Sequence, residues 1–556
     1  MVSHDVIIVG GGLAGLRAAV ETSQVADTAL ISKVHPLRSH SAAAQGGINA
    51  AIGQEDSWEI HAFDTIKGGD YLNDQPAVEI LCQKGIEEVF FMEHLGTPFS
   101  RSEDGRIAQW AAGGQQQYRT CYAGDRTGQV LLHTLYEQAL KQNLKVYQEW
   151  FVTSLIVEEG RCCGVIAMDI ASGRLEAFRA KATIFCTGGY GRIYARTTNG
   201  LSNTGDGMAV AYRAQVPLQD MEFVQFHPTS LFGSNILVTE ACRGEGAYLL
   251  NRHNERFLSR YAPGKMELAP RDIVSRSIET EILEGRGFPG GYVLLDLRHL
   301  GEKRITEKLG QVLELAKDFT RLNPIHEPIP IQPAQHYAMG GIPADVDGVT
   351  PRDGFYAAGE CACVSVQGAN RLGGNALLET LVFGCRVGQR VAQDVKNRDL
   401  PASGEAALAE EEKRLEAIKN GSRGERMGRI VKELTNTMWD KVGVFRDEKG
   451  LREAQDKIWE LQDRYSRLSV DDKSRAFNTE LVSALELGNM LTVAEVIVAG
   501  ALTRQESRGG HFRNDYSQRD DKGFLHHTLA YKTAEGVRLE RKEVAITRYQ
   551  PAERTY

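Results

Sequence analysis

The clearest hydrophobic pattern lies near the N-terminus, where a short apolar run is followed at once by glycines. Residues 5–9 read Asp-Val-Ile-Ile-Val, which predicts a buried strand, and residues 17–23 have the spacing of a helix. Between them stands Gly10-Gly11-Gly12-Leu13-Ala14-Gly15. Gly-x-Gly-x-x-Gly between a strand and a helix is typical of a dinucleotide-binding fold, because glycine lets a pyrophosphate approach the helix N-terminus.

The second apolar run, residues 28–32, predicts the next strand and ends without the acidic residue that binds a ribose in an ordinary NAD site. Ser32 and Lys33 stand in that place. A serine hydroxyl can still bind ribose or phosphate, so this departure counts against NAD and leaves FAD open. Further strands are predicted at 152–157 and 164–169, and strands that run into glycine turns at 182–189 and 354–360.

Two changes of pattern divide the rest of the chain. From about Met221, turns, arginines and Gly/Pro pairs become frequent, and we expect an inserted domain over 221–340. The dinucleotide-binding domain then comprises 1–220 and 341–400. After Pro401, apolar positions spaced along polar segments predict a helical domain at 405–520, followed by a polar tail at 521–556.

Composition narrows the class of protein. The 556 residues are 42% hydrophobic and 25% charged, as in soluble globular proteins, and the net charge of −8 argues against a nucleic-acid-binding surface. We find no uninterrupted apolar run near the ~18 residues of a membrane span, and we place the most apolar run at 377–382. The first predicted strand follows the N-terminus closely, so we expect no signal or transit peptide. We therefore expect a cytoplasmic chain, attached to a membrane through partners if at all.

Nine cysteines are present, and none forms a Cys-x-x-Cys pair. Zinc and iron–sulfur sites usually show clustered spacing, so we predict no metal site in this chain. If electrons leave a flavin here one at a time, their carrier must belong to another subunit.

A histidine lies among small residues shortly after the second strand, in Arg38-Ser39-His40-Ser41 and Ala44-Gln45-Gly46-Gly47. Taken alone, His40 is most simply interpreted as a hydrogen-bonded loop residue. The segment resembles the flavin-attachment segment of the succinate dehydrogenase/fumarate reductase flavoprotein subunits. The likeness continues through 506–509 and 519–521, so it covers nearly the whole chain.

This resemblance implies an α/β fold: a Rossmann-like FAD-binding domain with an inserted α+β capping domain and a C-terminal helical domain. It also implies FAD bound covalently through His40, at the flavin 8α-carbon, and it puts Asp206 at the flavin. The implied cofactor-binding residues are Gly10, Gly11, Gly12, Leu13, Ala14, Gly15, Ser32, Lys33, Ser39, His40, Ser41, Gln45, Gly46, Gly47, Thr187, Gly188, Asp206, Glu360, Ala376 and Leu377.

A dicarboxylate needs cations or hydrogen-bond donors at both ends, and four separate segments offer them. Singly, each has a plain explanation, such as a turn histidine before a proline. By the resemblance, His336 and Arg371 bind one carboxylate, while His227 and Thr239 bind the other. The resemblance makes Arg271 the proton-transferring residue, and Glu240 and Arg243 the relay to solvent.

The resemblance further implies an iron–sulfur subunit as partner, membrane anchor subunits reached through it, and a peripheral position on the cytoplasmic side of the cell membrane. Gln45 resembles the succinate dehydrogenases, so we favour succinate oxidation; the alternative is a fumarate reductase working in the opposite direction. L-aspartate oxidase, a related flavoenzyme, lacks a histidine at the place of His40, and adenylylsulfate reductase lacks the matching dicarboxylate residues. A noncatalytic assembly flavoprotein is disfavoured by the intact set of candidate catalytic residues.

Overall fold

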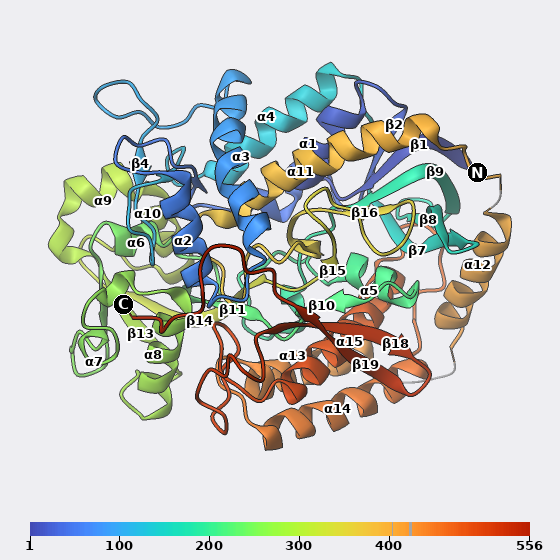
Figure 1. Cartoon of the computed structure of the whole chain (residues 1–556). Helices are drawn as coiled ribbons and strands as arrows, with labels where there is room; N and C mark the ends of the chain where they lie inside the picture. The colour runs from blue at the N-terminus through green and yellow to red at the C-terminus, as the bar shows by residue number, and fades with distance from the viewer. Residues whose placement is uncertain (403, 422–424, 556) are drawn as a thin grey trace.

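The computed structural model describes residues 1–402, 404–421 and 425–555. Residues 422–424 of the predicted helical domain, and Tyr556 at the end of the predicted tail, lie outside the described residues. The fold is built on a sheet in the order β6-β2-β1-β9-β8-β7, with β16 paired to β9 (Figure 1). Its strands are β1 (Val2–Val9), β2 (Thr28–Ser32), β6 (Lys145–Gln148), β7 (Trp150–Glu158), β8 (Arg161–Asp169), β9 (Leu175–Phe185) and β16 (Phe355–Ala357).

The long strand β9 joins the two halves of this sheet. Its first half pairs antiparallel with β8, and residues 178–185 pair in parallel with β1. Its last residues also pair in parallel with β16, which comes from the far side of the inserted segment. The dinucleotide-binding domain is therefore closed by a strand that follows the insertion in the chain.

Two helices pack tightly beside the glycine turn. Helix α1 (Leu13–Thr22) begins four residues before the predicted start, directly after the turn, and α11 (Asn375–Asp394) lies against it. A Cβ atom on Gly384 or Gly388 of α11 would lie 2.8 Å from a carbonyl oxygen of α1. These two glycines let the helices approach closely and fix the first turn of α11 near the start of α1.

Smaller elements complete this domain. A three-stranded sheet is formed by β3 (Ile48–Asn49), β5 (Thr120–Cys121) and β4 (Gln109–Trp110). The remaining elements are α2 (Trp58–Gly68), α3 (Gln75–His94), α4 (Thr127–Lys141), α5 (Asp206–Arg213), and the parallel pair β15 (Ile342–Pro343) and β17 (Ala362–Cys363).

The inserted segment forms an α+β unit with its own apolar core. Its antiparallel sheet has the order β11 (Val224–Leu231), β14 (Ile329–Ala338), β13 (Val293–Asp296) and β12 (Tyr248–Leu250). The helices are α6 (Ala241–Gly244), α7 (Leu258–Tyr261), α8 (Arg271–Leu283), α9 (Glu302–Lys308) and α10 (Gly310–Thr320). Leu249, Ile278 and Leu295 belong to a core separate from that of the first domain. We refer to this unit as the cap.

Among the described residues, four helices follow the second half of the dinucleotide-binding domain: α12 (Glu405–Lys419), α13 (Met427–Val442), α14 (Glu448–Ser466) and α15 (Thr479–Thr503). Helix α15 is long and apolar enough to cross a membrane by length and composition, but 72% of its apolar window is buried against the rest of the chain. Our placement of the most apolar stretch at 377–382 was therefore wrong, because α15 holds the longer one. Its packing is that of a core helix.

The predicted polar tail contains regular structure. Strands β18 (His526–Thr533) and β19 (Gly536–Glu543) form an antiparallel hairpin, and β18 also pairs with β10 (Leu218–Gln219). Charged residues on the exposed strand β19 concealed this hairpin in the sequence pattern. Beyond it the chain passes α2 and ends beside the cap, where Figure 1 marks the C-terminus near β13 and α8.

Candidate active site

A cavity of about 500 Å³ lies between the FAD-binding domain and the cap, which contributes Ile236, Leu237, Gln311 and Leu315 to its wall. This volume is within the usual range of small-molecule sites. Seventeen of the predicted cofactor residues line it: Gly10, Gly11, Gly12, Leu13, Ala14, Ser32, Lys33, Ser39, His40, Ser41, Gln45, Thr187, Gly188, Asp206, Glu360, Ala376 and Leu377.

The three other predicted cofactor residues lie outside this lining. A Cβ atom on Gly15 would stand 2.0 Å from the carbonyl oxygen of Gly10, so Gly15 serves the tight turn itself. The carbonyl oxygen of Gly46 accepts a hydrogen bond from the Trp110 indole at 2.9 Å. Gly47 has φ +115° and lies against the carbonyl of Cys121. These glycines shape the backbone around the cavity.

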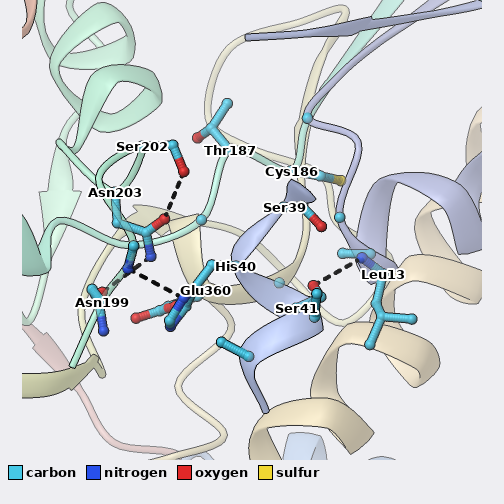
Figure 2. A pocket seen from close by; sticks show the side chains of 18 of the residues that line it. Leu13, Ser39, His40, Ser41, Cys186, Thr187, Asn199, Ser202, Asn203 and Glu360 are labelled. Atoms are coloured by element: carbon cyan, nitrogen blue, oxygen red, sulfur yellow. Dashed lines mark hydrogen bonds between the residues drawn. The ribbon is translucent and has the colours of Figure 1, made fainter. Parts of the chain in front are cut away.

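The first turn of α1 forms a cradle for a phosphate-containing ligand. The Ser41 hydroxyl accepts a hydrogen bond from the backbone N–H of Leu13 at 3.2 Å, and a Cβ on Gly11 would lie 2.9 Å from the Ser32 hydroxyl. The buried hydroxyls of Ser39 and Thr187 find no partner among the described residues. Figure 2 shows the hydrogen bond between Ser41 and Leu13, with Ser39 nearby. The open hydroxyls and the helix N-terminus suit the pyrophosphate and ribityl oxygens of FAD.

Lys33 is engaged at the β2 end of the cavity. Its ammonium group contacts Asp206 at 2.6 Å and Glu486 of α15 at 2.7 Å, and Asn489 of α15 donates to the other Asp206 oxygen. Asp206 therefore lies beside Lys33, just after the end of β2. In a dinucleotide-binding fold the ribose binds near the end of this second strand. The helical domain closes this end of the site through Glu486.

His40 lies at the opposite side of the cradle, where its ring lines the cavity (Figure 2). Its Nδ1 atom accepts a hydrogen bond from the backbone N–H of Gly200 at 3.3 Å. Burial lowers the pKa of His40 to about 4, so its imidazole is neutral at pH 7. Because Nδ1 accepts in this neutral ring, the ring proton is carried by Nε2.

Arg371 is a cation buried beside the cavity, and its side chain is 3% exposed. Its Nη1 donates weakly to the carbonyl of Leu372 at 3.4 Å, and its Cζ lies 4.4 Å from the centre of the Tyr337 ring. Within the described part of the chain, no carboxylate lies within 4 Å of its guanidinium nitrogens. Burial, and then the neighbouring charge of Arg271, lower its pKa to about 10.

Two histidines stand next to Arg371. The rings of His227 and His336 lie 4.9 Å apart, and Nδ1 of His336 is 2.8 Å from the hydroxyl of Thr198. Burial, followed by neighbouring cationic groups, holds both pKa values well below the usual histidine range. The nearby Thr239 hydroxyl is buried and accepts from the N–H of Ala241 at 3.3 Å. These groups provide neutral hydrogen-bonding partners for a ligand.

The third part of the site is an acid held between two arginines. Glu240 contacts Arg271 Nη2 at 2.6 Å and Arg243 Nη2 at 3.4 Å, and all three residues are buried. Burial raises the pKa of Glu240, but Arg271 and Arg243 lower it more, so it lies well below its usual range. The cluster of Arg243, Arg271 and Arg371 with Glu240, which we call the anion site, has a formal charge of +2.

Sequence reasoning missed several residues that hold this arrangement. Gln225 accepts from Arg271 Nη1 at 3.1 Å and donates to the carbonyl of Arg371 at 2.7 Å, so it links the two arginines. The N–H of Gly113 donates to Glu240 at 2.8 Å. Gln225 stands two residues before His227 and could have been found there, whereas nothing in the pattern around Gly113 predicts its contact.

Glu360 adds a buried carboxyl group to the cavity wall. It accepts a hydrogen bond from the N–H of Ala338 at 3.0 Å, and burial raises its pKa to about 7. Burial therefore favours the neutral form of this carboxyl group.

The described residues include no cluster of metal-binding side chains. Among the residues that the structure describes, no group of three His, Cys, Asp or Glu side chains could hold a metal ion. All nine cysteines are buried and unbridged.

Comparisons with known proteins agree with this geometry. An FAD-binding-domain family model matches residues 5–377, and a fumarate reductase flavoprotein C-terminal model matches 431–556. The chain is 45% identical to a fumarate reductase flavoprotein subunit of Mycobacterium tuberculosis, with 100% of this chain and 99% of the relative covered. It is 43% identical to a succinate dehydrogenase flavoprotein subunit of Rickettsia bellii, over 99% and 98%. A chain of Escherichia coli quinol fumarate reductase superposes with a TM-score of 0.97 at 42% identity, over 100% and 99%. The predicted fold class and FAD as the cofactor are confirmed.

Proposed function

The chain belongs to the succinate dehydrogenase/fumarate reductase flavoprotein family, and from that premise we propose that it interconverts succinate and fumarate at the anion site. It is an FAD-dependent oxidoreductase. The observation that carries the substrate assignment is the buried Arg371, whose charge is balanced by no carboxylate among the described residues. A buried cation without a counter-ion is costly, and a substrate carboxylate removes that cost.

The anion site also matches the substrate in charge. Three arginines and one glutamate leave two positive charges, and succinate carries two negative ones near neutral pH. We assign one carboxylate to Arg371 and His336, where the planar guanidinium can bind both oxygens. The other carboxylate is assigned to His227 and Thr239. A monocarboxylate would leave one of these ends unfilled.

FAD, when bound, supplies the atom that accepts a hydride from one methylene carbon of succinate. Arg271 receives the proton from the neighbouring carbon and passes it to Glu240 and Arg243. Arginine stays protonated in proteins, so Arg271 acts only by releasing one proton as it gains another. Its Nε and Nη2 contacts with Glu240, at 2.9 and 2.6 Å, provide the path for that exchange.

A covalent flavin bond at His40 is part of the proposal. The neutral imidazole has Nδ1 held by the N–H of Gly200, which supports Nε2 as the nitrogen that would lose its proton and form the bond to the flavin carbon. Ultraviolet fluorescence of the denatured polypeptide tests this, because only a covalently bound flavin migrates with the chain. In His40→Ser, we expect FAD retained without the bond and succinate oxidation lost; a dark wild-type band contradicts the bond.

For the direction of the reaction we propose succinate oxidation, on the basis of Gln45. This buried amide donates to the carbonyl of Leu237 at 3.3 Å and lines the cavity. A carboxylate here would oppose the negative charge of reduced flavin, so a neutral side chain raises the flavin potential. The fumarate reductase relatives favour the opposite direction. Gln45→Glu should lower the ratio of succinate oxidation to fumarate reduction; an unchanged ratio contradicts the Gln45 argument.

Electrons taken from succinate must leave the flavin for an acceptor outside this chain. We propose an iron–sulfur subunit as that acceptor, with membrane anchor subunits bound through it, and a peripheral position on the cytoplasmic side of the cell membrane. A solved relative supports an assembly that reacts with quinones, since it is a quinol–fumarate reductase with menaquinol molecules.

The experiment that tests the function is succinate-dependent reduction of a dye by the purified chain, with fumarate identified as the product. Arg271→Lys should keep its FAD and lose turnover by roughly 10²–10⁴-fold, the usual contribution of general acid–base catalysis. Wild-type protein with full flavin and no succinate-dependent dye reduction would overturn the proposal. Turnover near wild type in Arg271→Lys would remove only the proton role of Arg271.

A further inference from the structure

The last twelve described residues run along the FAD-binding domain toward the cap. Gln75, at the start of α3, holds them through its amide oxygen, which accepts the N–H groups of Arg548 at 2.7 Å and Tyr549 at 2.9 Å. The ring of Tyr549 packs edge-on against Phe63 of α2 at 5.3 Å. Lys67, at the end of α2, donates to the carbonyl of Thr555 at 2.9 Å. The segment is thus fixed along its length.

Arg554 is the point where this segment reaches the cap. Its side chain is 10% exposed, and Nη1 lies 3.1 Å from both Asp70 and Asp272. Nη2 lies 3.2 Å from the second oxygen of Asp272. Asp70 belongs to the turn between α2 and α3 of the FAD-binding domain, whereas Asp272 is the second residue of cap helix α8. One guanidinium therefore joins two domains of the protein.

These contacts are part of a longer series in which acids and arginines alternate. Each neighbouring pair is joined by a contact of 2.8 to 3.1 Å. We call the series the junction cluster, and its members in order are Glu222, Arg504, Glu506, Arg508, Asp521, Arg519, Asp70, Arg554, Asp272 and Arg276. Arg554 joins Asp70 to Asp272, the first of the two members on α8; the other member, Arg276, also donates to the carbonyl of Gly509 at 2.8 Å.

Asp272 is connected to the anion site in two ways. It directly follows Arg271 in the chain, and its Oδ1 accepts from the Asn370 amide at 3.1 Å. Asn370 directly precedes Arg371 and accepts from Gln225 at 2.9 Å, and Gln225 in turn accepts from Arg271. Three hydrogen bonds thus connect Arg271, Gln225, Asn370 and Asp272 into a ring that the peptide bond between Arg271 and Asp272 closes, and the Arg371 backbone carbonyl is bonded to Gln225 of this ring. Asp272, Asn370 and Gln225 are all buried.

We propose that Arg554 is a positioning residue for catalysis, which sets the relative placement of Arg271 and Arg371 by holding Asp272. The inference rests on the proposed function, because it concerns the same anion site. Arg554 grips both oxygens of Asp272, which fixes the first turn of α8 against rotation, and its bond to Asp70 ties that turn to the FAD-binding domain. A shift of about 1 Å in a catalytic group can lower turnover by roughly 10²-fold.

The test compares three variants of the purified flavoprotein by succinate–dye reduction, FAD content and thermal unfolding. In Arg554→Ala we expect kcat to fall about 10- to 100-fold while the FAD content stays at the wild-type level. Guanidinium ion added at millimolar concentration should restore part of kcat, because it fits the space of the missing group. Arg554→Lys should recover kcat to within several-fold of wild type, since it keeps a cation near both acids.

Arg548→Ala is the matched control, because it removes one positive charge from the same segment. Arg548 stacks over Trp58 at 5.1 Å, its side chain is 45% exposed, and it has no contact with the cap among the described residues. Its kcat should equal that of wild type. Wild-type kcat in Arg554→Ala overturns the inference. If Arg554→Ala fails to fold, Arg554→Lys decides: a folded lysine variant without recovered kcat also overturns it. Inactive wild-type protein instead refutes the proposed function.

Discussion

The anion site and the junction cluster are both built from buried or partly buried arginines, yet they differ in charge balance. The junction cluster holds five arginines and five carboxylates in alternation, so each guanidinium meets an acid. The anion site has three arginines and one glutamate. Burying a guanidinium is expensive unless it is paired. The junction cluster, with equal numbers of both charges, therefore stabilises the contact between parts of the fold. The anion site, with an excess of positive charge, can bind an anionic ligand.

This difference predicts opposite responses when a charge is removed. In the balanced cluster, neutralising one member leaves an opposite charge buried and unpaired, which destabilises the folded state. In the anion site, neutralising an unpaired arginine removes an existing cost and destroys the binding of the ligand. Activity and stability should thus separate the two clusters at every member except Arg554, which also acts on the anion site through Asp272.

The largest expected effect comes from Arg371→Gln. The variant loses up to two charge-assisted hydrogen bonds to a substrate carboxylate, so we expect kcat/KM to fall by about 10⁴-fold. Its melting temperature should equal or exceed that of wild type, because a buried, unpaired cation is gone. Steady-state kinetics and a thermal melt at a fixed scan rate check both parts. A lower melting temperature would show that Arg371 is structurally paired.

Glu506→Gln probes the balanced cluster and should behave in the opposite way. Glu506 accepts from Arg504 at 3.0 Å and from Arg508 at 2.8 and 3.0 Å, and it is fully buried. Loss of its charge should destabilise the fold by about 3–4 kcal/mol, while the folded protein keeps its turnover. Glu540→Gln, on the exposed hairpin strand β19, is the control. Equal melting temperatures for the two variants would contradict the comparison.

A third prediction concerns the pH dependence of a neighbouring buried pair. His527 lies 2.6 Å from Asp220 and 3.2 Å from Asp74, and these acids raise its pKa to about 9 despite the opposing effect of burial. A raised pKa means that the folded state holds the proton more tightly than the unfolded chain does. The stabilisation is fully present below pH 6.5 and is lost as pH rises through about 9.

The size of this effect follows from the pKa change, at 1.36 kcal/mol per unit, and amounts to about 3 kcal/mol. Thermal unfolding at several pH values between 6 and 10 measures it. In His527→Gln this loss should be absent, and the curve should be flatter over that interval. A wild-type stability that does not fall between pH 6.5 and 9 would show that His527 is not charged in the fold.

The two regions also differ in how far the sequence predicts them. The cradle at residues 10–15 was predicted because strand, glycines and helix follow one another in a single segment. The junction cluster was not, since its contacts join residues such as Asp70 and Arg554 that are hundreds of positions apart. The local sequence pattern also did not predict the hairpin at 526–543, because most of its outer strand, β19, is exposed and charged. Long-range pairing of polar groups leaves no periodic mark on a sequence.

The smallest effect is expected from substitution of Tyr337, whose ring packs against the guanidinium of Arg371. Its ring faces the Arg371 guanidinium at 4.4 Å, and its hydroxyl donates to Glu379 at 2.6 Å. A desolvated cation–π contact contributes about 1–2 kcal/mol, so Tyr337→Leu should raise the KM for succinate roughly tenfold, with a smaller change in kcat. Tyr337→Phe keeps the ring, and its KM should remain near wild type. If Tyr337→Phe raises KM as much as Tyr337→Leu does, the ring is not what holds Arg371. The hydrogen bond from the Tyr337 hydroxyl to Glu379 would then position Arg371, and the anion site would depend on a buried carboxylate.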